Sequence, residues 1–124
     1  MRQRLRRIVE NTALAHGATA EVDIQDGYPP MYNNDVLSEL IERTARELFG
    51  DANVQTKLPT SMGTEDFSYY AQKVPASMFR LGVRSPDSDT CPPLHSPRFN
   101  FNDDALPVGI RMLCELTRRY LASA

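Results

Sequence analysis

The sequence has almost no net charge, because its basic and acidic residues nearly balance, and it has no long hydrophobic run. Its 14 Lys and Arg residues against 16 Asp and Glu residues give a formal net charge of −2. A basic nucleic-acid-binding surface is therefore not expected. No apolar stretch approaches the about 20 residues that a transmembrane helix needs, and no apolar signal-peptide segment follows the arginines of residues 2–7. We therefore expect a cytoplasmic protein that binds neither nucleic acid nor a membrane.

The sequence is also poor in cysteine. Cys91 and Cys114 show no CxxC spacing, which argues against a disulfide framework or a structural zinc knuckle and favours two free thiols. Hydrophobic residues make up 41% and charged residues 24% of the 124 residues. These fractions are typical of one modest globular domain.

Apolar residues at helical spacing predict three longer helices. The first covers residues 5–16, with Gly17 as a left-handed C-cap, and its arginine-rich start without a capping residue resembles the middle of a helix. The second runs from Asn33 or Asn34 to Gly50. Its predicted buried residues are Val36, Leu37, Leu40, Ile41, Ala45 and Leu48. The third begins at Asp103 or Asp104. Its predicted buried stripe is Leu106, Ile110, Leu113, Cys114, Thr117 and Leu121.

Between these helices, the pattern predicts three strands, at residues 20–25, 54–58 and 77–83. Further predicted segments are a proline-containing linker at 27–32, a short helix within 65–71 and an irregular proline-rich loop at 84–102. Alternating helices and strands indicate an α/β fold, but three strands make an incomplete sheet. We expect a partner chain or a missing piece of the same polypeptide to cover its faces and edges.

His95 lies between prolines in the long loop, in the run Pro92-Pro93-Leu94-His95-Ser96-Pro97. A stiff backbone preorganises an imidazole for metal binding or proton transfer. The alternative is a histidine that packs in the loop and forms local hydrogen bonds, because a single histidine without partners is a weak metal signature.

The loop that contains Gly63 leads into Glu65 and Asp66 at the expected start of the short helix. These carboxylates either cap that helix or line a site where backbone amides of the loop receive an anionic group. The Asn102-Asp103-Asp104 cluster is interpreted as a helix cap rather than a cation site.

Three segments in order carry a resemblance to a known family. They are Gly63-Thr64-Glu65-Asp66-Phe67-Ser68-Tyr69-Tyr70, then Val74-Pro75-Ala76 with Met78-Phe79-Arg80-Leu81-Gly82, then the run from Leu94-His95-Ser96-Pro97 to Gly109. Together they resemble the C-terminal motifs of the dinuclear-metal amidohydrolases. That family includes hippurate hydrolase, indole-acetyl-amino-acid hydrolase, N-acetyl-diaminopimelate deacetylase and aminoacylase, and is distantly related to carboxypeptidase G. The resemblance covers essentially the whole chain.

The resemblance implies an incomplete three-layer α/β catalytic domain with a helix-strand remnant of a lid or dimerisation domain. Residues 1–31 would be the lid remnant and return linker, and residues 32–124 the C-terminal part of the catalytic domain. His95 would take the place of the last ligand to a divalent metal, which is zinc, manganese or cobalt. Gly63, Glu65 and Asp66 would lie at the substrate pocket. The other metal ligands and the general base of the family lie outside the matched segments.

Two hypotheses of function follow. The first is a C-terminal fragment of a metal-dependent amidohydrolase or peptidase that acts on an N-acyl amino acid or peptide, and whose missing N-terminal part supplies the remaining active-site groups. We expect little hydrolysis by the isolated chain. The second is a non-catalytic oligomerising or binding module, present as a homo-oligomer such as a dimer, that kept the surfaces of the fold but lost most metal ligands.

Overall fold

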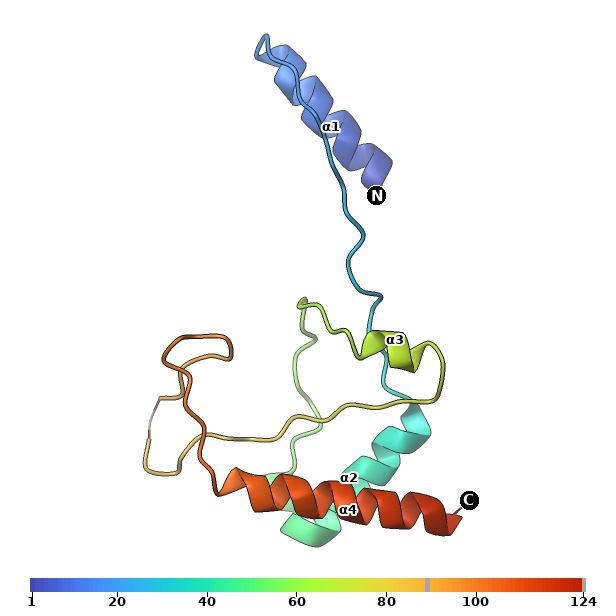
Figure 1. The fold of residues 1–124 in the computed structure, drawn as a ribbon, viewed down its shortest axis with the longest axis vertical. Coiled ribbons are helices and arrows are strands. Elements are labelled where there is room, and N and C mark those ends of the chain that lie inside the picture. Colours follow the sequence, from blue (N-terminus) through green and yellow to red (C-terminus); the bar gives the residue numbers. More distant parts are fainter. Residues whose placement is uncertain (89, 124) are drawn as a thin grey trace.

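A computed structural model describes residues 1–88 and 90–123 of the chain. Within them lie the helices α1 (Arg2–Ala15), α2 (Asp35–Phe49), η1 (Asp51–Asn53), α3 (Ser68–Ala71) and α4 (Ala105–Ser123), joined by extended segments and turns (Figure 1). None of the described helices is both long and apolar enough to span a membrane. The long proline-rich loop is irregular as predicted, apart from residue 89, which lies outside the described residues.

Helix α2 begins and ends as the sequence predicts. The side-chain oxygen of Asn34 accepts a hydrogen bond from the backbone nitrogen of Leu37 at 3.1 Å, which satisfies one of the free amides at the helix start. At the other end, Gly50 has a φ of 84° and its nitrogen donates to the carbonyl of Arg46. A positive φ favours glycine, because glycine has no Cβ to clash with the backbone.

Helix α1 lies away from the other helices and packs against the chain that follows it (Figure 1). Its N-cap residue Met1 provides no side-chain cap, as expected from the sequence, and Gly17 has the predicted positive φ. Residues Val22 and Ile24 are half-buried where the returning segment runs along the helix. Arg2 forms an ion pair with Asp26 that closes this arm. The domain division at residues 31 and 32 stays a prediction.

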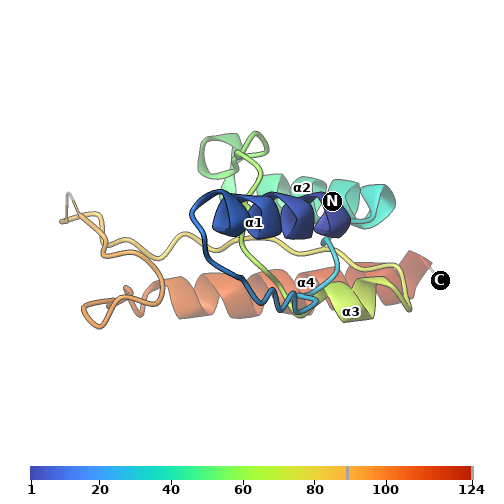
Figure 2. The ribbon, with the colours of Figure 1, turned by 90° about the horizontal axis from the view of Figure 1, so that it is seen from above.

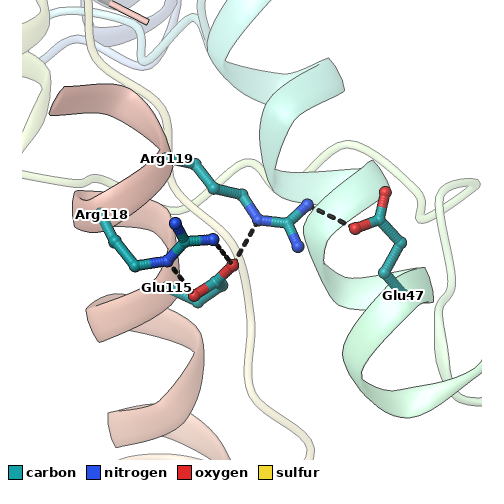
Figure 3. Close-up of polar contacts among 4 residues, drawn as sticks. All are labelled: Glu47, Glu115, Arg118 and Arg119. Carbon is teal, nitrogen blue, oxygen red and sulfur yellow. Dashed lines mark hydrogen bonds and ion pairs between the residues drawn. The ribbon is translucent and has the colours of Figure 1, made fainter. Parts of the chain in front are cut away.

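The body of the molecule is built on the packing of α2 against α4. Thr44 of α2 is fully buried and Met112 of α4 is 3% exposed. At one edge of the contact, Arg119 Nη1 lies 2.6 Å from Glu47 Oε2, and Arg119 Nε donates to Glu115 at 2.7 Å (Figure 3). The guanidinium of Arg111 lies 5.7 Å from the ring centre of Phe49, which gives a cation–π contact between the two helices.

The predicted buried stripe of α4 is wrong. All six of its residues are exposed, with Ile110 at 63% and Leu121 at 68%, and Ala105 and Met112 on the opposite face are buried instead. A helix with apolar residues on both faces can bury either one, and only packing on α2 selects the face. On α2 the predicted burial fails at Val36, which is 72% exposed. The other residues of the predicted set are half-buried, namely Leu37, Leu40, Ile41, Ala45 and Leu48.

None of the three predicted strands forms within the described residues. A strand exists only through hydrogen bonds to a neighbour, and these segments do not pair with one another. Residues 1–88 and 90–123 form helices and extended segments, so the predicted three-layer α/β architecture is not confirmed. The alternation of side chains persists, because Val22 and Ile24 are half-buried while Glu21, Asp23 and Gln25 are exposed. The alternation therefore indicates an extended segment, but the predicted strand is not confirmed.

The segment of residues 76–83 runs extended along one side of the α2–α4 pair (Figures 1 and 2). Its start is fixed by the backbone nitrogen of Asn34, which donates to the carbonyl of Ala76 at 2.8 Å. Its end is fixed by the backbone nitrogen of Asn102, which donates to the carbonyl of Val83 at 2.9 Å. The segment thereby connects the start of α2 to the start of α4 and leads into the loop that carries His95.

Candidate functional site

His95 lies in a tight turn of the proline-rich loop. The backbone nitrogen of Ser96 donates to the carbonyl of Pro93 at 3.0 Å, which closes a four-residue turn with His95 at its third position. The next turn is closed by the nitrogen of Phe99, which donates to the carbonyl of Ser96 at 2.9 Å. Two consecutive turns between prolines restrict the backbone, and the imidazole is exposed to solvent.

The backbone of His95 is strained. Its φ is 70°, and among the described residues it is the single non-glycine residue with positive φ. This conformation at the third position is the mark of a type II turn, where glycine or asparagine is preferred. The left-handed conformation costs an L-residue roughly 1–2 kcal/mol. A positive φ is uncommon for a residue other than glycine, although histidine adopts it more readily than most residues do.

Glu65 precedes α3, whose N-cap residue Phe67 has no side-chain cap hydrogen bond, so neither sequence interpretation is decided. Its Oε1 accepts a hydrogen bond from the backbone nitrogen of Phe67 at 3.1 Å, and its carbonyl accepts one from the hydroxyl of Ser68 at 2.5 Å. Glu65 is half-buried, while Asp66 beside it is exposed. The backbone nitrogen of Gly63 donates to the hydroxyl of Ser61 at 3.2 Å. These bonds shape the loop but are compatible with either role for the two carboxylates.

The structure does not bring the candidate residues together. The loop that carries His95 lies at one end of the body, and the segment that leads into α3 lies apart from it in both views (Figures 1 and 2). Within residues 1–88 and 90–123, no three His, Cys, Asp or Glu side chains gather where they could share a metal ion. The chain therefore presents the two halves of a candidate site separately.

The cluster Asn102-Asp103-Asp104 is a helix cap, as the sequence predicts. The side-chain oxygen of Asn102 accepts from the backbone nitrogen of Asp104 at 3.1 Å, and its carbonyl accepts from Ala105 at 3.1 Å. The helix therefore begins at Ala105, one or two residues later than expected.

Sequence reasoning did not indicate the open hollow between α3 and the start of α2. It has a volume of about 480 Å³, and its lining includes Asn34, Asp35, Lys73 and Pro75. None of the predicted site residues lines it. Pro75 lies in one of the segments that carry the family resemblance, and no residue pattern in the sequence predicts a hollow beside it.

Comparison with known proteins identifies the family to which the chain belongs. Residues 5–119 match peptidase family M20/M25/M40. The chain belongs to this family. A probable hydrolase of Synechocystis is 35% identical to this chain over 113 residues. The match covers 91% of this chain and 29% of the Synechocystis protein.

Two further relatives of the M20 chain have named activities. An IAA-amino acid hydrolase of Arabidopsis thaliana is 30% identical over 125 residues, covering 98% of this chain and 27% of the plant protein. An N-acetyldiaminopimelate deacetylase of Streptococcus suis is 32% identical over 119 residues, covering 95% of this chain and 30% of that enzyme. The M20 chain thus spans under a third of the length of these relatives.

Proposed function

We propose that this chain is part of a metal-dependent amidohydrolase that cleaves the amide bond of N-acyl amino acids. Family membership supports a hydrolase, and two similar relatives carry names of enzymes that act on an amino-acid conjugate or an N-acetylated amino acid. The chain contributes the loop of His95 and the loop of Gly63, Glu65 and Asp66. The rest of the active site comes from polypeptide outside this sequence.

The observation that carries the proposal is the turn of His95. A positive φ at a histidine is unfavourable for folding, so a role for the exposed imidazole accounts for its presence better than local packing does. We propose that the imidazole contributes one ligand to a divalent metal such as zinc, manganese or cobalt. We propose that Gly63, Glu65 and Asp66 line the substrate pocket, with Glu65 also holding α3 in place.

The described residues do not fit a metal ion by themselves. A tightly held catalytic zinc has about three protein ligands, and no such group exists within the described part of this chain. His95 would be a single exposed donor. The proposal therefore requires donors from the remaining polypeptide, and we assign no reaction step to this chain alone.

The test is complementation with a matched pair of histidine variants. The chain is mixed with the preceding part of the Synechocystis relative, and hydrolysis of N-acetyl amino acids is followed with added zinc, manganese or cobalt. We expect His95→Ala to lower kcat/KM at least about 100-fold, since loss of even an outer-shell partner costs 10–100-fold. His16→Ala removes the other histidine, which lies at the end of α1, and should leave activity within about twofold of the unmodified chain.

Equal activity of the His95→Ala and unmodified mixtures would contradict the role of His95. Metal content measured on the chain alone provides a second readout, with far less than one ion per chain expected. A metal-free homodimer that remains inactive in every mixture would instead favour the non-catalytic oligomerising module.

A further inference from the structure

The junction between the α1 arm and the rest of the chain contains Asp26 followed by Gly27. The α1 arm is helix α1 together with the returning segment 18–26, and it lies away from the other helices (Figure 1). Residues 27–32 then lead toward the start of α2. Asp26 is the one Asp or Asn residue of the sequence that directly precedes a glycine. The pair therefore differs chemically from the other aspartates of the chain.

The backbone nitrogen of Gly27 is free to react. Asp26 and Gly27 are both exposed, and the structure places residues 18–34 in no helix or strand. The Gly27 nitrogen donates no hydrogen bond to any group within residues 1–88 and 90–123. Apart from its neighbours in the chain, a Cβ built on Gly27 would have no atom within 4 Å. The nitrogen is therefore neither held by a hydrogen bond nor covered by a side chain.

Other aspartates of the chain lack one of these conditions. The backbone nitrogens that follow Asp66 and Asp104 already donate hydrogen bonds. Asp23 lies in the same segment as Asp26 and is equally exposed, but the residue after it is Ile24, which is half-buried. The branched side chain of Ile24 hinders approach to its own nitrogen and restricts its backbone. Asp26 thus combines an exposed carboxyl group with an unhindered nitrogen beside it.

A carboxyl group and the next backbone nitrogen can close a five-membered succinimide ring. The Gly27 nitrogen attacks Cγ of Asp26, an N–Cγ bond forms, and the N–H proton leaves with the carboxyl OH as water. A second water molecule then opens the ring. Its attack at Cγ restores aspartate, whereas its attack at the backbone carbonyl breaks the bond from that carbonyl to nitrogen and gives isoaspartate. The main chain of isoaspartate runs through Cβ and Cγ, and the sequence of steps needs no reactant other than water.

We propose that Asp26 is a site of spontaneous isomerisation to isoaspartate through a succinimide formed with Gly27. The ion pair between Asp26 and Arg2 does not prevent this, because both side chains are exposed. An exposed pair lowers the free fraction of a carboxylate by no more than about fivefold. The proposal concerns the junction alone and does not depend on the proposed hydrolase function.

Isomerisation changes the junction of the α1 arm in two ways. It adds one main-chain bond of about 1.5 Å, and it places the carboxylate one bond closer to the main chain, which alters the contact with Arg2. Because the α1 arm lies away from α2 and α4 (Figure 1), the change is confined to the arm and the linker. Backbone NMR shifts of the isomerised chain should therefore differ within residues 1–32 and stay the same in α2 and α4.

The test is storage of the chain at neutral pH over weeks in water enriched in heavy oxygen, followed by peptide mass spectrometry. Asp-N protease, which cleaves before aspartate but not before isoaspartate, and electron-transfer fragmentation locate the product. We expect isoaspartate that carries one heavy oxygen to accumulate at residue 26. Its rate of formation should lie within about threefold of the rate in a synthetic peptide of residues 20–32, because the fold leaves this segment open.

Gly27→Ala is the variant that tests the chemistry. Gly27 has no positive φ, and an added Cβ would contact nothing outside its chain neighbours, so alanine fits without strain. Isomerisation should slow at least about tenfold, because the methyl group hinders the attacking nitrogen and restricts its backbone. Gly82→Ala is the matched control, since Gly82 also has no positive φ and no atom within 4 Å of a built Cβ. This control should leave the rate at Asp26 within about twofold of the unmodified chain.

Three results would overturn the proposal. The first is isoaspartate in the peptide but none in the chain, which would show that the fold protects the Gly27 nitrogen. The second is an equal rate in the Gly27→Ala and unmodified chains. The third is faster formation of isoaspartate at Asp23 than at Asp26. Far-UV circular dichroism of both glycine variants confirms that the helices are kept, so that a slower rate reflects the local chemistry.

Discussion

At the scale of single residues, His95 shows a conflict between folding and side-chain identity. Its turn needs a positive φ, which glycine supplies without penalty, yet the position holds an exposed imidazole. Glu65 shows no such conflict, since its carboxylate satisfies a backbone amide at the start of α3. The two candidate residues therefore differ in kind. His95 opposes stability locally, while Glu65 supports it.

Replacement of His95 by glycine should stabilise the chain. We expect the free energy of unfolding to rise by about 0.5–1 kcal/mol, because relief of the left-handed strain exceeds the added entropy of the unfolded chain. Urea unfolding followed by circular dichroism measures the change. Leu94→Gly is the control, since Leu94 lies in the same turn without a positive φ, and it should lower stability by about 0.5–1 kcal/mol. Destabilisation by both variants would contradict a strained His95.

At the scale of elements, the contact between α2 and α4 combines a small apolar core with an ionic network at its edge. Glu115 accepts hydrogen bonds from Arg118 and Arg119, and Arg119 continues to Glu47 on α2 (Figure 3). The hydrogen bonds from Arg118 and then Arg119 lower the pKa of Glu115 from 4.5 to about 2. The carboxylate is therefore held in its charged form by the fold.

The free energy of unfolding should fall in acid, because Glu115 loses its charge there. Its pKa is lower in the folded than in the unfolded chain, so its stabilising contribution is present above about pH 4.5 and is lost as the pH falls toward about 2. Urea unfolding of the unmodified chain and of Glu115→Gln, compared between about pH 5 and about pH 2, measures this contribution. The variant should lose less stability over that range. Parallel losses in both proteins would show that the network does not stabilise the folded state.

At the scale of the whole molecule, the chain contains many apolar side chains but buries few. Among the described residues the buried hydrophobic ones are Ala76, Ala105 and Met112, and the outer face of α4 is exposed along its length. A helix with apolar residues all round is normally buried within a larger core. The chain spans under a third of the length of the relatives that it matches.

The small buried area should appear in denaturation. The slope m of the unfolding free energy against urea is proportional to the surface exposed on unfolding. For this chain we expect m to be roughly 30% below that of a compact protein of the same mass. Equilibrium urea unfolding with sedimentation at the same concentration gives m and the mass together. An m value typical of a compact domain in a monomer would contradict the open structure.

Much of the local structure could be predicted from the sequence. The cap at Asn34, the positive φ of Gly17 and Gly50, and the irregular proline-rich loop follow from residues that act on their immediate neighbours. The buried face of α4 could not be predicted, because both faces are apolar. The burial of Thr44 could not be predicted either, because a polar residue does not contribute to an apolar pattern. Thr44 is fully buried, and its hydroxyl has no hydrogen-bond partner among the described residues.

For the candidate site, the sequence determined the family and the two loops that carry its motifs, because motifs are local strings of residue types. It also determined where extended segments lie, since side-chain alternation has a fixed period. Only the tertiary structure decided that these segments stay unpaired, that His95 and the Gly63 loop lie apart, and which face of α4 meets α2. These features depend on contacts between distant parts of the chain, whose partners no local pattern specifies.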